Sequence, residues 1–129
     1  MDLFRRQWTV AARALGTPAH VAQQCVHFAA KICDAHEEVA SLTHALVLLE
    51  RLLVRGHTPS QDDLRGCVLL AVQMTVDENL ATTTELRLLL GAERELIYVQ
   101  INVLESLDYR VVVSRSEFVV YRNALSAIP

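Results

Sequence analysis

Cysteine and histidine side chains gather in one stretch of the chain, at Cys25, His27, Cys33 and His36. These residue types bind Zn²⁺, but a structural zinc ion needs four ligands arranged tetrahedrally around it. All four side chains fall on one predicted helix or at its end, and a single helix cannot surround an ion. We therefore expect no metal site and interpret the four as ordinary helix residues.

Catalytic groups are also not indicated. Cys67 lies in the apolar stretch "LRGCVLLAVQM", where a thiol is more often inert than nucleophilic. A phosphate-binding loop would need clustered glycines, whereas Gly66 and Gly91 stand alone. We expect a protein that is not an enzyme and that carries no cofactor.

Two glutamines stand inside apolar stripes with helical spacing. The first stripe consists of Leu70, Gln73, Met74 and Asp77. The second consists of Ile97, Gln100, Ile101 and Leu104. If the two helices are neighbours, Gln73 and Gln100 form the polar centre of an apolar binding face. In the alternative interpretation the apolar positions belong to the core and the glutamines simply face water.

Composition favours an exposed apolar patch and limits the kind of partner. The chain is 52% hydrophobic and 21% charged, which leaves few polar residues to cover a small domain. Met74 is flexible and suits a binding surface. Asp77 is expected near the end of its helix, either solvated or facing a cationic side chain of a partner.

Several classes of partner and compartment are disfavoured. The net charge is −3 and the arginines are scattered along the sequence, so no nucleic-acid partner is expected. No apolar run reaches the length of a membrane span, which predicts no membrane insertion. Three cysteines without a signal peptide indicate a reducing compartment, either cytoplasmic or nuclear.

Apolar periodicity predicts an all-α domain, and capping signals divide it into helices. The expected helices cover residues 2–16, 17–35, 41–56, 58–76, 82–91, 93–107 and 114–128. Capping boxes are predicted at Thr58 with Gln61, Thr82 with Glu85, and Ser114 with Glu117. The third helix is expected to open at Ser41. The segment "YRVVV", residues 109–113, is expected to be a buried connection.

The order of these segments resembles the cyclin box. The strongest stretch is "INVLESLDYRVVV", which is similar to the place where cyclins run a long helix into a leucine, an aromatic residue and an apolar hook. The resemblance implies a single cyclin box at residues 17–129, a five-helix bundle around a central apolar helix, with an extra N-terminal helix at residues 1–16. Divergent single-box relatives, such as the phosphate-pathway type and Cables-like cyclins, are more similar to it than the mitotic cyclins.

The resemblance also implies a function and the residues that carry it. Cyclins hold the regulatory helix of a kinase with a lysine of the central helix and a glutamate of the penultimate helix, and here these positions are Gln73 and Gln100. The implied apolar platform consists of Leu70, Met74, Leu104, Tyr109 and Val111. The implied partner is a protein kinase of the cyclin-dependent type, in a cell-cycle role, with the catalysis belonging to the kinase.

A second function is kept beside this one. Loss of both signature charges favours a cyclin-fold scaffold that activates nothing, either an adaptor or a self-associating module. Homo-oligomer formation therefore stays open. Restoring the two charges distinguishes the alternatives, because a working kinase-binding surface should bind more tightly with them.

Overall fold

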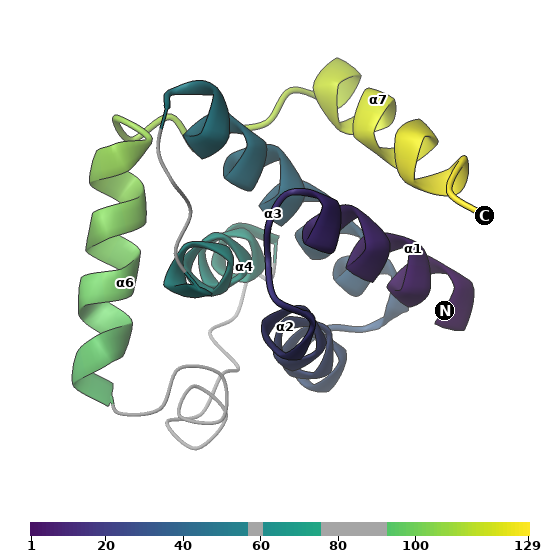
Figure 1. Cartoon of the computed structure of the whole chain (residues 1–129), viewed down its shortest axis with the longest axis horizontal. Coiled ribbons are helices and arrows are strands. Elements are labelled where there is room, and N and C mark those ends of the chain that lie inside the picture. Colours follow the sequence, from purple (N-terminus) through teal and green to yellow (C-terminus); the bar gives the residue numbers. More distant parts are fainter. Residues whose placement is uncertain (57–60, 76–92) are drawn as a thin grey trace.

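The computed structural model describes residues 1–56, 61–75 and 93–129, and all regular elements within these residues are helices (Figure 1). They are α1 (Asp2–Ala14), α2 (Ala19–Ile32), α3 (Ala35–Val54), α4 (Gln61–Thr75), α6 (Glu93–Ser106) and α7 (Arg115–Ser126). The predicted all-α class is confirmed for this part of the chain. The predicted box of Thr82 with Glu85, and Thr58 of the preceding one, lie outside the described residues.

Helices α3 and α4 form the middle of the bundle. α3 packs against α1, α2, α4 and α7, and α4 packs against α2, α3 and α6. In Figure 1 α4 is seen nearly end-on between α6 and the other helices. Most of α4 is apolar and buried, from Leu64 to Val72, which makes it a core helix. Among the described helices, none combines the length and hydropathy that crossing a membrane requires.

Helix α1 shares this core and is tied to α3 by two polar contacts. The Trp8 side chain is fully buried, and its indole N–H donates to the carbonyl oxygen of Leu42 at 2.7 Å. Arg5 donates to both carboxylate oxygens of Glu38 at 2.8 and 2.9 Å, which raises the pKa of Arg5. Glu38 is almost completely buried, so this two-point contact compensates its charge.

The start of α3 corrects one predicted boundary. The helix begins at Ala35, and the Asp34 side chain accepts from the Glu37 backbone N–H at 2.8 Å. The Glu37 side chain accepts in return from the Asp34 backbone N–H at 3.0 Å, which completes a capping box. The expected start at Ser41 was wrong, because Ser41 lies fully buried inside the helix.

The α6–α7 connection, residues 107–114, is held by side chains of α3. His44 Nε2 lies 2.7 Å from the carbonyl oxygen of Val111, and Arg51 Nη1 donates to the carbonyl oxygen of Arg110 at 2.9 Å. Val111 is half-buried, but Tyr109 and Val112 are exposed. The prediction of a buried connection is therefore correct only for part of the segment. At its end Ser114 caps α7 by accepting from the Glu117 backbone N–H, which is one half of the predicted capping box. The Glu117 side chain forms an ion pair with Arg51 instead of completing the box.

The capping box of α3 generates a first prediction. Asp34→Ala removes the acceptor for the Glu37 N–H and should lower the free energy of unfolding by about 1 kcal/mol. Asp34→Asn keeps an acceptor oxygen at the same position and is the matched control, expected near wild type. Chemical denaturation of the three proteins measures the difference, and equal stabilities would contradict the role of the cap.

The contact between His44 and the Val111 carbonyl predicts a dependence of stability on pH. Burial lowers the pKa of His44 below its ordinary value of 6.5, against a smaller raising effect of the carbonyl. As pH falls through about 6.5, the unfolded chain takes up a proton at this residue before the folded chain does, so stability decreases. We expect the melting temperature to decrease more between about pH 7.5 and 5.5 in wild type than in His44→Gln. Glutamine keeps a hydrogen-bond donor at this position but does not titrate. Parallel pH profiles of the two proteins would contradict the assignment.

Candidate functional site

The last turn of α4 carries the chain from the core to the surface. The side chains up to Val72 are buried, whereas Gln73 and Met74 are exposed. The buried part of α4 packs against α2, α3 and α6. Its C-terminal end carries the polar residue Gln73 and the flexible residue Met74, which suit an exposed position. The end of α4 is thus available to solvent beside α6.

Helix α6 lies close against α4 because Gly66 has no side chain. A Cβ atom at Gly66 would lie 2.7 Å from Val103 Cγ2 and 2.9 Å from Val99 Cγ1. These two valines recur four residues apart, and Leu107 continues the row, so one face of α6 is buried. The close approach sets the separation of the two helices along this part of their interface.

The two predicted glutamines meet across this interface. Gln100 Nε2 donates a hydrogen bond to Gln73 Oε1 at 2.8 Å. Among the described residues neither amide has a further hydrogen-bond partner, so the NH2 group of Gln73 and the carbonyl oxygen of Gln100 stay available. The pair therefore presents a donor and an acceptor side by side at the surface.

Apolar side chains adjoin this pair in the sequence of both helices. Met74 is 44% exposed and Ile101 is 42% exposed, while Leu104 is partly buried and packs against the core. We name the surface formed by Gln73, Met74, Gln100, Ile101 and Leu104 the α4–α6 face. It combines uncharged hydrogen-bonding groups with exposed apolar area, and it carries no charged side chain among these five.

The remaining residues predicted for the binding site lie elsewhere. Leu70 is only 7% exposed and belongs to the core, so it supports the α4–α6 face from inside and is not part of the surface. Val111 also packs against the core, through the α6–α7 connection. Tyr109 is 65% exposed, at a turn with positive φ after α6. Asp77 lies outside the described residues, as does the side chain of Ile97.

The cysteines lie in environments that do not activate a thiol. Burial raises the pKa of Cys25 to about 12, and burial also raises the pKa of Cys67 well above its ordinary value. The thiolate, which is the nucleophile and the metal ligand, is therefore disfavoured at both positions. The described part of the chain has no group of three or more histidine, cysteine, aspartate or glutamate side chains placed to hold a metal ion.

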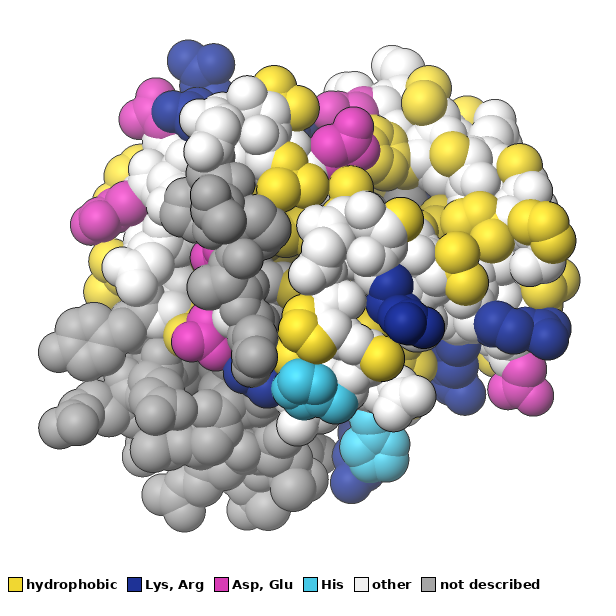
Figure 2. Space-filling view, viewed as in Figure 1, with side chains coloured by type: hydrophobic (Ala, Val, Ile, Leu, Met, Phe, Trp, Pro, Cys, Tyr) yellow, Lys and Arg dark blue, Asp and Glu magenta, His cyan; other side chains and the backbone are white. Residues whose placement is uncertain are grey.

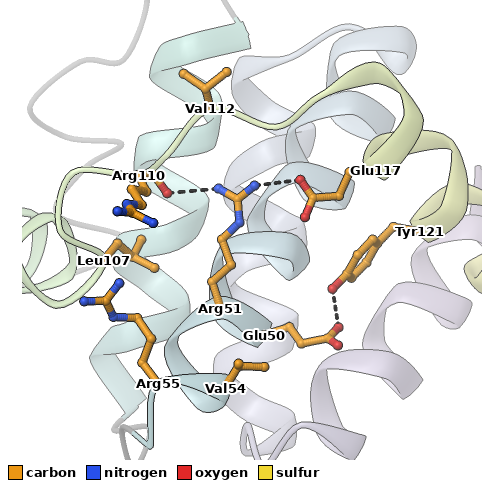
Figure 3. A pocket seen from close by; sticks show the side chains of 9 residues that line it. All are labelled: Glu50, Arg51, Val54, Arg55, Leu107, Arg110, Val112, Glu117 and Tyr121. Carbon is orange, nitrogen blue, oxygen red and sulfur yellow. Dashed lines mark hydrogen bonds and ion pairs between the residues drawn. The ribbon is translucent and has the colours of Figure 1, made fainter.

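Sequence reasoning missed a cluster of polar residues between α3, α7 and the α6–α7 connection (Figure 3). Arg51 forms an ion pair with Glu117 at 2.6 Å, and the Tyr121 hydroxyl donates to the Glu50 carboxylate. The sequence showed Glu50 and Arg51 only as an acidic residue next to a basic one. Their partners lie 66 to 71 residues further along the chain, a separation that local pattern does not bridge.

Comparisons of the chain with protein-family models, with curated proteins and with solved structures find no match.

The approach of α6 to Gly66 generates a prediction on stability. Gly66→Ala places a methyl group against Val99 and Val103, an overpacking expected to cost about 1–3 kcal/mol. Alanine also favours the helix by about 1 kcal/mol, so a net loss of about 1 kcal/mol is expected. Val103→Ala removes the nearest clash, and the loss caused by Gly66→Ala should be smaller in that background. A stabilising Gly66→Ala, measured by denaturant unfolding, would contradict the close contact.

Proposed function

We propose that this chain is a cyclin-like regulatory subunit that binds a protein kinase of the cyclin-dependent type through the α4–α6 face. The observation that carries the proposal is the hydrogen bond of 2.8 Å between Gln100 and Gln73 on the surface of α4 and α6. These are the two positions at which the resemblance to cyclins expects the lysine and glutamate that hold a kinase helix. The bundle also surrounds α4 with α2, α3 and α6, which is consistent with a central helix.

The mechanism uses the free groups of the two amides. Gln73 donates from its NH2 group to a backbone carbonyl of the partner helix, and Gln100 accepts from a backbone N–H. Met74, Ile101 and Leu104 supply the apolar contact around this polar centre. Binding stabilises the active position of the kinase regulatory helix, which completes the lysine–glutamate pair needed for phosphoryl transfer.

Neutral amides change the energetics of such a contact. They avoid the desolvation cost of burying two charges, but each neutral hydrogen bond contributes about 0.5–1.5 kcal/mol, compared with about 1.5–3 kcal/mol for a charged one. We therefore expect the two glutamines to bind the kinase helix with lower affinity than a lysine and a glutamate would. More of the affinity then comes from the apolar side chains.

A non-activating scaffold that associates with itself is the second candidate, and a separate surface favours it. Figure 2 shows apolar side chains gathered over the part of the molecule that α1 and α7 form in Figure 1. The large exposed apolar residues of these two helices are Leu3, Val10, Val119 and Val120. Such a surface buries apolar area when two copies meet, without use of the α4–α6 face.

One pair of variants separates the two functions. Ile101→Arg places a charge on the α4–α6 face, and Val120→Arg is the matched control on α7, since both positions are exposed. In affinity purification from native extract with mass spectrometry, a protein kinase should be recovered with wild type and Val120→Arg and lost with Ile101→Arg. Recovery of no kinase, or of the same kinase with Ile101→Arg, would contradict the proposal. Loss of self-association in Val120→Arg would support the scaffold.

With the recovered kinase purified, the two signature charges can be restored. Gln73→Lys with Gln100→Glu should tighten binding roughly tenfold, because charged hydrogen bonds replace neutral ones. Isothermal titration of the kinase with wild type and the double variant measures the change. Equal or weaker binding by the double variant would show that the kinase does not contact these two positions in the expected way.

A further inference from the structure

A groove of about 550 Å³ lies between the C-terminal end of α3, the α6–α7 connection and α7 (Figure 3). Three arginines line it: Arg51 and Arg55 from α3 and its C-cap, and Arg110 from the connection. Two acidic residues, Glu50 and Glu117, line it as well. Which of these charges are already paired decides what the groove can bind.

Both acidic groups are engaged inside the protein. Glu117 accepts from Arg51 Nη2 at 2.6 Å, and Glu50 accepts from the Tyr121 hydroxyl. Burial, together with the hydrogen bond to Glu50, raises the pKa of Tyr121, so the tyrosine stays a neutral donor. Arg51 also donates to the carbonyl of Arg110, and its charge is therefore used within the fold.

The other two arginines are available. Within the described residues the Arg55 side chain has no hydrogen-bond or ion-pair partner, and the Arg110 side chain has a single ion-pair contact, with the exposed Asp108 at 4.0 Å. An ion pair of this length between two exposed side chains contributes little to the free energy of folding. The groove consequently presents two guanidinium groups without a close ion-pair partner, from two different segments of the chain. Its lining of three arginines and two glutamates has a net positive charge, which favours an anionic ligand.

The groove also has an apolar wall. Val54 and Val112 are exposed although both are aliphatic, and Leu107 lies between the two segments that carry the free arginines. Figure 3 shows Arg110 and Arg55 on the same side of the groove as Leu107. A ligand that fits this lining joins an anionic group to an adjacent aliphatic side chain.

We propose that this groove binds a peptide segment that carries a phosphorylated serine or threonine next to a large aliphatic residue. A phosphate carries a charge near −2 and has three acceptor oxygens, so it can contact both guanidinium groups at once. A carboxylate has two oxygens and a single charge, which one arginine already satisfies. The aliphatic neighbour packs against Val112, which is exposed two residues after Arg110. The groove is separate from the α4–α6 face, and this inference does not depend on a kinase partner.

The test uses the full chain and pools of short degenerate peptides with a central phosphoserine, serine or glutamate. We expect immobilised wild-type protein to bind more of the phosphoserine pool than of the serine or glutamate pool. The bound peptides should be enriched in aliphatic residues beside the phosphate. A fluorescein-labelled peptide from the selected set should then bind at least about tenfold more weakly to Arg55→Gln with Arg110→Gln, because two charge-assisted contacts are lost.

Arg6→Gln with Arg13→Gln is the control with the same change in net charge, since both residues are exposed on α1 and neither lines the groove. We expect all variants to fold, because the substituted side chains are exposed. Measured melting temperatures check this. No retention above the serine pool, or an equal loss of binding in the α1 control, would overturn the site. Equal retention of the glutamate pool would overturn the assignment of phosphate. Val112→Asn should remove the aliphatic preference, and an unchanged preference would overturn the role of the apolar wall.

Discussion

The absence of a side chain at Gly66 is the constraint on which the α6 side of the molecule depends. Val99 and Val103 of α6 occupy the space that a Cβ atom would take, so α6 lies directly against α4. This approach brings Gln100 within hydrogen-bonding distance of Gln73. Leu107, which follows α6 and starts the α6–α7 connection, is also buried. The α4–α6 face thus depends on the close contact at Gly66.

Helix ends were predictable where the signal is local and chemical. Gly16 and Gly56 both adopt positive φ just after helices that end within two residues of the predicted positions, and Ser114 caps α7. The start of α3 was missed although Asp34 and Glu37 form an ordinary capping box, because the preceding helix was extended through Asp34. Cys33 has an extended backbone and ends α2, which apolar periodicity alone does not reveal.

The candidate sites show a similar division between local and tertiary information. Helical spacing predicted that Gln73 and Gln100 each lie in an apolar stripe, but not that they bond to each other, which requires the packing of α4 on α6. The same spacing put Leu70 on the stripe of Gln73, although one turn along α4 separates a core position from a surface position. Arginines that are scattered along the sequence converge at the groove because the fold returns Arg110 to the end of α3.

The way in which α3 holds the α6–α7 connection explains why this segment can present functional side chains. His44 and Arg51 bind the carbonyl oxygens of Val111 and Arg110, so the backbone is fixed without use of the connection's own side chains. Tyr109, Arg110 and Val112 are therefore exposed on a segment of defined position. A side chain on such a segment loses less conformational freedom when a ligand binds than one on a free loop, since the backbone is already ordered. Holding the main chain from α3 thus favours binding by Arg110 and Val112, which line the groove.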